Sequence, residues 1–122
     1  LEGNKTEQFF VQFVFKRPGQ NTADFHFFSD GTVLREDFSA NTQILAGVEV
    51  FLLEKEKIDL IRGKISSDLF DSRTGIENCF EKGLEYGYLE VQMDEQYGFF
   101  WTCGAQSSKA DELFNDLLKE FG

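Results

Sequence analysis

Phenylalanine places the strongest constraint on the fold, because 15 phenylalanines must find apolar surroundings within 122 residues. Each buried ring removes about 150–250 Å² of surface from water, so these rings must supply much of a single hydrophobic core. Within residues 9–15, Phe10 and Val14 lie on one side of an extended chain. The opposite side carries Phe9, Val11, Phe13 and Phe15. This double alternation predicts a central strand that is covered on both faces near its middle.

Turn residues divide the next segment into hairpins. A proline-glycine pair at residues 18–19 interrupts the first strand, since proline presets a turn dihedral and glycine accepts a positive φ. Phe25 and Phe27 share one face of the second strand. The dipeptide formed by Asp30 and Gly31 then predicts a two-residue type I′ turn. Further strands are predicted at residues 32–38, 44–53, 84–93 and 97–103, and the last two form a second hairpin.

The apolar spacing changes to a helical period in two segments. Residues 54–66 place Ile58, Ile61 and Ile65 on one side of a helix, which Gly63 weakens. Residues 67–82 show no period and form the longest irregular stretch, so a functional loop is expected there.

The C-terminal helix has the clearest signals. Ser107 or Ser108 suits the N-cap position, acidic residues at 111–112 favour the first turn, and Gly122 follows the end. Such a helix must pack on the sheet, because its apolar residues form one continuous stripe. The stripe consists of Ala110, Leu113, Phe114, Leu117, Leu118 and Phe121.

The resulting order, β-β-β-β-α-β-β-α, predicts a two-layer α+β fold with an antiparallel sheet and two helices on one face. A closed or half-closed barrel with a plugging helix is the competing architecture. Residues 1–7 are expected to form a frayed polar leader, and residues 8–122 a single domain.

Charge restricts the classes of partner. The chain has 22 acidic and 12 basic residues, which gives a formal net charge of -10. Such a chain repels nucleic acid and anionic lipid and attracts basic proteins, although the same acidity also keeps a phenylalanine-rich chain in solution. The sequence has no apolar run of about 18 residues, so it predicts no transmembrane helix. The first residue is Leu1 rather than Met, which slightly favours a periplasmic or secreted protein over a cytoplasmic one.

Catalytic motifs are absent from the sequence, which contains no phosphate-binding glycine loop, no nucleophile elbow and no His-Glu-x-x-His helix. His26 lies between Phe25 and Phe27, so it faces away from their side of the strand. Cys79 and Cys103 are the only cysteines, and the sequence leaves open whether they are bonded. We therefore expect His26 to be a structural or exposed strand residue and predict no catalytic residue.

Acidic pairs offer the nearest approach to a metal site. Asp94 with Glu95, and Asp68 with Asp71, lack the ligand spacing of a calcium-binding loop. We expect these carboxylates to be solvated in turns, and we predict neither a metal nor a cofactor.

Aromatic residues concentrate in the second hairpin. Strand alternation requires some of their rings to point toward the face that the helices leave open. Exposed tyrosine and tryptophan are typical contact anchors, whereas cross-strand packing in the core is the alternative. The predicted partner-binding residues are Tyr86, Tyr88, Tyr97, Trp101, Asp94, Glu95 and Asp71.

These observations predict a small, acidic, non-enzymatic protein-binding module, such as an inhibitor, an immunity-type neutraliser or an accessory subunit of a basic partner. The alternative is an extracytoplasmic, lipoprotein-like domain that holds a small molecule in an apolar pocket between the sheet and the helices. An enzyme that uses Cys103 with His26 is a third hypothesis.

Overall fold

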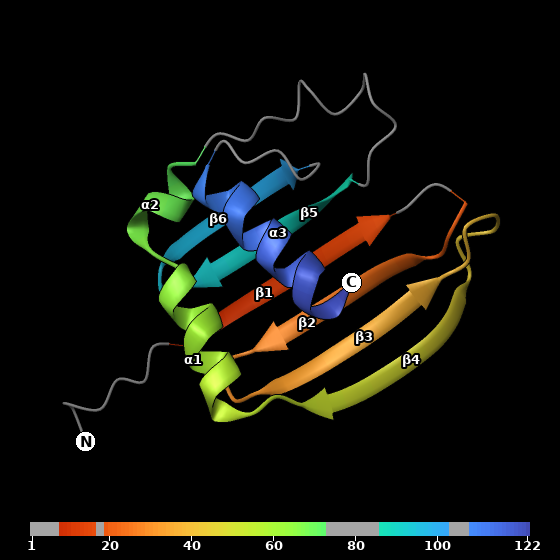
Figure 1. Ribbon diagram of the computed structural model, residues 1–122, viewed down its shortest axis with the longest axis horizontal. Coiled ribbons are helices and arrows are strands. Elements are labelled where there is room, and N and C mark those ends of the chain that lie inside the picture. The colour runs from red at the N-terminus through yellow and green to blue at the C-terminus, as the bar shows by residue number, and fades with distance from the viewer. Residues whose placement is uncertain (1–7, 17–18, 73–85, 103–107) are drawn as a thin grey trace.

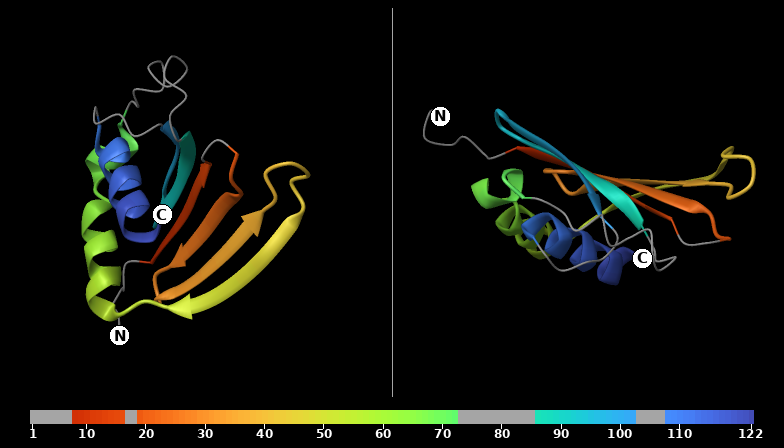
Figure 2. Two further views of the ribbon diagram at one scale, coloured as in Figure 1. Left: turned by 45° about the vertical axis from the view of Figure 1, so that its right-hand side comes forward. Right: turned by 90° about the horizontal axis from the view of Figure 1, so that it is seen from above.

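A computed structural model describes residues 8–16, 19–72, 86–102 and 108–122. In these residues a six-stranded antiparallel sheet, with strand order β4-β3-β2-β1-β5-β6, carries three helices on one face (Figures 1 and 2). The strands are β1 (Phe9–Lys16), β2 (Thr22–Phe28), β3 (Thr32–Phe38), β4 (Leu45–Leu52), β5 (Tyr86–Met93) and β6 (Gln96–Thr102). The helices are α1 (Lys55–Lys64), α2 (Ser67–Phe70) and α3 (Lys109–Phe121). The predicted two-layer α+β architecture is confirmed.

Strand β1 lies in the middle of the sheet, as its double alternation predicts. It pairs with β2 on one side and β5 on the other, so that Phe13 stands between Phe25 and Leu89. All three of these side chains are buried on the helix side. On the other side, no helix of the described chain covers Phe10 and Val14, which are shielded by side chains of neighbouring strands instead. The expectation that this strand is covered on both faces near its middle is confirmed at Val14, which is buried, whereas Phe10 is only partly buried.

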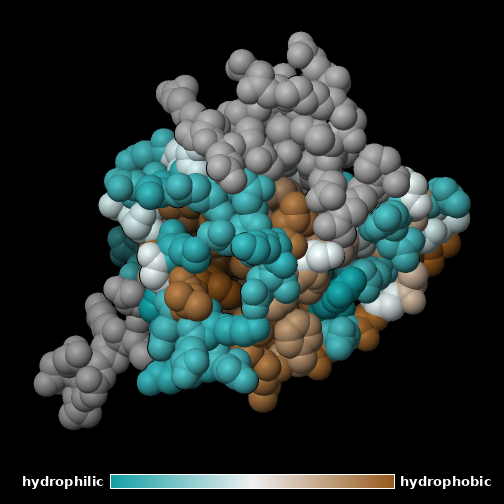
Figure 3. All heavy atoms as spheres, viewed as in Figure 1, coloured by the Kyte–Doolittle hydropathy of each residue, from teal (hydrophilic) through white to brown (hydrophobic). Residues whose placement is uncertain are grey.

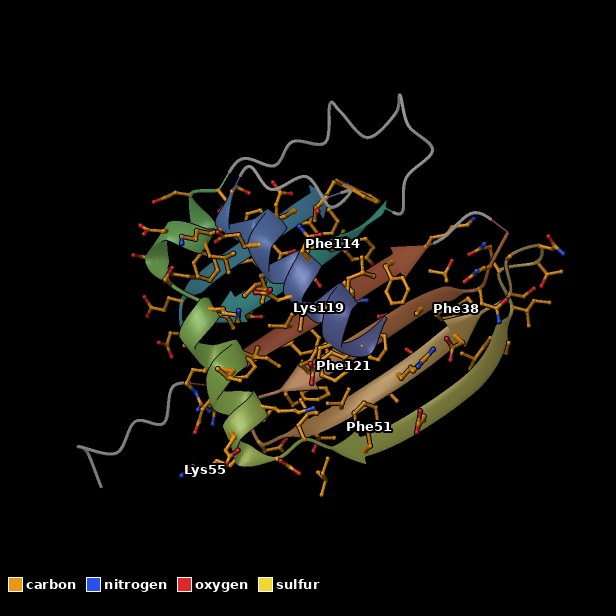
Figure 4. All side chains as sticks on the ribbon, viewed as in Figure 1. Phe38, Phe51, Lys55, Phe114, Lys119 and Phe121 are labelled. Carbon is orange, nitrogen blue, oxygen red and sulfur yellow. The ribbon has the colours of Figure 1, made fainter. Side chains whose placement is uncertain are left out.

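Helix α3 supplies the aromatic contacts that hold the two layers together. The Phe114 ring meets the Phe13 ring edge-on, with 5.2 Å between centroids. At the other end of the helix, the Phe121 ring lies 5.8 Å from that of Phe25 and 5.1 Å from that of Phe27. Figure 4 shows Phe114 and Phe121 beneath the helix, turned toward the sheet. Edge-on and offset ring pairs of this kind add about 0.5–1.5 kcal/mol each beyond the area that they bury.

The predicted N-cap of this last helix is Ser108. Its Oγ accepts a hydrogen bond from the backbone N–H of Asp111 at 3.2 Å and donates one to the Asp111 carboxylate at 3.0 Å. At the C-terminal end, the N–H of Gly122 donates to the carbonyl of Leu118. Both ends of α3 thus satisfy backbone groups that would otherwise lack partners.

Helix α1 buries Ile58, Ile61 and, just beyond its last turn, Ile65. Ion pairs from Lys57 to Glu120 and from Lys64 to Asp116 join α1 to α3 across their solvent side. This is the helix expected over residues 54–66. Helix α2 lies within the predicted irregular stretch and was not expected, because a single turn of four residues shows no period.

The turn between β2 and β3 differs from the type I′ turn expected for Asp30 and Gly31. Type I′ requires positive φ at both central residues, but only Gly31, at φ 98°, has one. The N–H of Gly31 donates to the Phe28 carbonyl, and the N–H of Thr32 donates to the Asp30 carboxylate at 2.8 Å. The loop is therefore a three-residue hairpin, in which the Asp30 side chain replaces a backbone partner.

The helices cover only part of the sheet. Figures 1 and 2 show the helices on one side of the sheet, where α3 reaches as far as β2, while β3 and β4 curve away beyond it. Arg35 of β3 places its guanidinium 5.1 Å from the Phe25 ring centre, and Phe51 of β4 packs at the edge of the core. Strands β4 and β6 are the two edges of the described sheet and do not pair with each other, so the alternative of a closed barrel is wrong.

One further expectation can be checked here, and three others fall outside the described residues. No helix of the described chain is long and apolar enough to span a membrane. The polar leader at residues 1–7, residues 73–82 of the predicted loop, and both Cys79 and Cys103 lie outside the described residues.

Two glycines provide opposite tests of this packing. A Cβ at Gly87 would lie 1.8 Å from the Val14 carbonyl oxygen, whereas one at Gly63 in α1 would meet nothing within 4 Å. We therefore expect Gly87→Ala to destabilise the fold by about 1–3 kcal/mol, because β1 and β5 must separate. Gly63→Ala should stabilise it by about 0.5–1 kcal/mol, because alanine restricts the unfolded chain and favours helix. Urea unfolding of both variants measures these changes, and equal midpoints would contradict the described approach of β5 to β1.

Candidate functional site

The face of the sheet opposite the helices is the candidate site, and we call it the open face. It consists of the alternate strand residues that point away from Phe13 and its buried neighbours. Large apolar side chains on this face are exposed to solvent, although isolated exposed apolar residues are normal and only a cluster is informative. The exposed apolar residues of the open face are Phe28, Val48, Val50, Leu52, Tyr97, Phe99 and Trp101.

Two of these rings, Phe99 and Trp101, form a cluster with the partly buried Tyr88 at the β5–β6 end of the open face. The ring centroids of Tyr88 and Phe99 are 4.9 Å apart and their planes are stacked, while Trp101 meets both rings edge-on at 5.3 and 5.7 Å. Phe99 and Trp101 remain 43% and 45% exposed. The cluster is therefore packed within itself but uncovered. Burial raises the pKa of Tyr88 above its usual 10.0, and the charges of Asp24 and Glu90 add to this shift.

Tyr97 extends this aromatic surface toward the start of β6, next to the β5–β6 turn. Its hydroxyl donates a hydrogen bond to the Glu90 carboxylate on the neighbouring strand. This hydrogen bond, more than the nearby charge, raises the pKa of Tyr97 above 10.0, because the carboxylate stabilises the protonated phenol. The pair places an acceptor and an aromatic ring side by side on the open face.

A row of polar side chains crosses the centre of the open face. The Gln12 amide of β1 donates to both carboxylate oxygens of Asp24 on β2, at 3.1 and 3.2 Å. His26 Nε2 lies 3.1 Å from Asp24 Oδ1 and 3.2 Å from Glu36 Oε1 on β3. Burial raises the pKa of Asp24 above 3.8, while His26 and Gln12 partly offset this effect. The row is therefore a desolvated, anionic cluster with one imidazole.

The structure brings three of the predicted partner-binding residues to the open face, namely Tyr88, Tyr97 and Trp101. Tyr86 begins β5, and its side chain lies outside the part of the chain that the structure describes. Asp71 is exposed at the end of α2, in the helix layer, and so is separate from this surface.

Asp94 and Glu95 form the exposed turn between β5 and β6. They border a shallow depression at the end of the sheet, which Phe10 and Phe28 also line. Asp94 adopts a positive φ of 53°. These two carboxylates therefore lie at the rim of the open face.

Sequence reasoning missed the polar row. Asp24 and His26 are two residues apart on one strand, which places them on the same face, and this spacing was an available signal. Glu36 could not be added from the sequence, because its position opposite Asp24 depends on the register of β3 against β2. The expectation that His26 faces away from Phe25 is confirmed.

No protein-family model matches the chain, and no curated protein matches it at a significant level. The functional interpretation therefore depends on the geometry of its own residues.

The tyrosine contacts can be tested by titration. We expect Glu90→Gln to lower the pKa of Tyr97 toward 10.0, because the neutral amide no longer favours the protonated phenol over the phenolate. Carbon-13 NMR of labelled tyrosine rings resolves each residue. Tyr88 is the internal control: its pKa is raised mainly by burial and should fall less. A larger shift at Tyr88 than at Tyr97 would contradict this assignment.

The same shift has a defined sign for stability. The pKa of Tyr97 is raised in the folded state, so the contribution of this hydrogen bond is fully present below the unfolded value of about 10. The contribution is lost as pH rises through the folded pKa.

Proposed function

We propose that this chain is a non-enzymatic protein-binding module that uses the open face to contact a basic partner. The observation that supports it most directly is the cluster of Tyr88, Phe99 and Trp101, whose rings pack together on a face that no described helix covers. Tyrosine and tryptophan at the centre of such a surface are the commonest anchors of protein interfaces. Their packing against one another lowers the entropy that would be lost on binding.

A second apolar patch supports the same proposal from the opposite edge. Val48, Val50 and Leu52 alternate along β4 on the open face and are 57%, 64% and 76% exposed. A free strand edge with such side chains offers unpaired backbone groups beside an apolar surface. The open face thus has an aromatic end and an aliphatic end.

The charge between these two ends favours a cationic partner. Asp24, Glu36 and Glu90 carry carboxylates on the open face, and the whole chain has a formal net charge of -10. Negative potential accelerates encounter with a basic protein, and arginine side chains bind well over aromatic rings. A partner that presents arginine and apolar residues together would complement both features.

The alternative of a small-molecule-binding domain has weaker support. The depression between α1 and α3 is lined mainly by polar and charged side chains, including Lys64, Glu112 and Asp116. Figure 3, viewed from the helix side, shows hydrophilic residues over much of this layer, with hydrophobic residues between them. The interior between the helices and the sheet is filled by phenylalanine rings such as Phe13 and Phe114.

Partner capture with matched variants tests the proposal. The wild-type chain, Trp101→Ala and Leu60→Ala serve as bait in extracts, at low and at moderate salt. Leu60 is the control because it is 64% exposed but lies on α1, in the helix layer. We expect a basic protein to bind the wild type and Leu60→Ala, and we expect this binding to weaken as salt rises.

With the captured partner purified, Trp101→Ala should raise the Kd by about fivefold or more, which corresponds to about 1 kcal/mol. Circular dichroism must show that this variant remains folded. Equal affinity of a folded Trp101→Ala variant, or a loss that Leu60→Ala shares, would reject the open face as the contact surface. A bound apolar small molecule in native mass spectra would favour the alternative function.

A further inference from the structure

The central polar row of the open face contains a donor set that partner binding does not explain. Asp24 and His26 point to the same side of β2, and Glu36 stands directly opposite Asp24 on β3. One ligand atom from each of these three side chains lies within 4.8 Å of the other two. Neighbouring strands therefore hold an imidazole nitrogen and two carboxylate oxygens around one point.

His26 Nε2 is the unusual atom in this arrangement. It is excluded from solvent and has no hydrogen-bond partner among the described residues. The Asp24 and Glu36 oxygens lie 3.1 and 3.2 Å away, which is ion-pair distance for a charged imidazole. The ring nitrogen thus points between two carboxylates. A solvent-excluded nitrogen held between two carboxylate oxygens is a place where a cation is stabilised, either as a proton on the ring or as a metal ion.

We propose that Asp24, His26 and Glu36 form a binding site for a divalent metal ion of the zinc type. Zinc bonds to nitrogen and oxygen are about 2.0–2.2 Å long, so ligand atoms of a tetrahedral site are about 3.3–3.5 Å apart. The two nitrogen–oxygen separations, 3.1 and 3.2 Å, are close to this value. Glu36 is the most exposed of the three side chains, at 27%, and has the freedom to bring its carboxylate closer to that of Asp24.

Neighbouring side chains hold two of the three ligands in place, as residues behind the ligands do in known metal sites. The Gln12 amide donates to both oxygens of Asp24 and fixes the orientation of that carboxylate. The Phe10 ring packs against the imidazole of His26, with 5.9 Å between centroids. A hydrogen-bonded carboxylate and a packed imidazole reduce the reorganisation that binding an ion requires.

The donor set also selects among metals. Two carboxylates and a neutral imidazole carry a charge of about -2, which a divalent ion balances. An imidazole ligand favours zinc and similar transition metals, whereas calcium and magnesium prefer oxygen ligands alone. Three protein ligands leave a fourth position for water, which faces the solvent side of the sheet. The competing occupant is a proton on His26, which would pair with both carboxylates.

NMR and calorimetry distinguish the ion from the proton. The chain contains one histidine, so imidazole nitrogen signals report on His26 alone. We expect zinc chloride to shift these signals in the full chain with one ion bound, and magnesium chloride to leave them unchanged. The titration is done on a Cys79→Ser/Cys103→Ser variant as well, because cysteines also bind zinc.

Matched variants locate the site. Glu36→Gln keeps the size of the side chain but removes its charge and should weaken zinc binding by about tenfold or more. Asp37→Asn is the control, because Asp37 is on the same strand but points to the helix side, where it pairs with Arg35. Circular dichroism establishes that both variants fold.

Zinc binding that is lost in the cysteine-free chain, unmoved His26 signals at saturation, or equal effects of Glu36→Gln and Asp37→Asn would each overturn the proposal. Retained binding with a His26 shift and a selective loss in Glu36→Gln would support it. The partner-capture experiment measures a different surface property, so either proposal can fail without the other.

Discussion

The fold depends on the contact between the apolar stripe of α3 and the phenylalanine face of β1 and β2. The sheet has one apolar face whose exposure to water would destabilise the fold. Phe114 and Phe121 of α3 cover this face at two points along the helix. Ser108 fixes where this helix begins. The ion pairs between α3 and α1 hold the two helices side by side. Because the stripe spans only part of the sheet, the same contact determines which strands remain uncovered.

Covering one face leaves the other face to water, and this second face carries the residues on which both proposals rest. An antiparallel sheet with one solvated face normally has polar residues there. Here the pattern holds only in the centre, where Gln12, Asp24 and Glu36 lie, and it fails at both ends. The rings at Trp101 and the aliphatic side chains at Val50 are exposed where polar residues would be more stable in isolation. Departures from the expected pattern at two ends of one surface are what the proposed contact function would require.

The sequence predicted those parts of the molecule that repeat with a short period. Alternation located the strands and placed His26 on the face away from Phe25, and the three-four spacing located α3 with its cap at Ser108. The sequence could not identify α2, since one turn has no period. It also could not predict the hairpin at Gly31, where a hydrogen bond from the backbone N–H of Thr32 to the Asp30 side chain competes with backbone preference. The sequence did not reveal the set of Asp24, His26 and Glu36 for a different reason. Contacts across strands depend on the pairing register, which neither strand encodes alone.

The two proposals meet in the charge of the open face. Asp24 and Glu36 contribute the negative potential that would attract a basic partner, and the same two carboxylates would bind the metal ion. A bound divalent ion cancels about two negative charges at the centre of the face while leaving the rings of Tyr88 and Trp101 unchanged. Electrostatic steering would then weaken, but the apolar anchors would persist, so metal occupancy would change the rate of association more than the contacts of the complex.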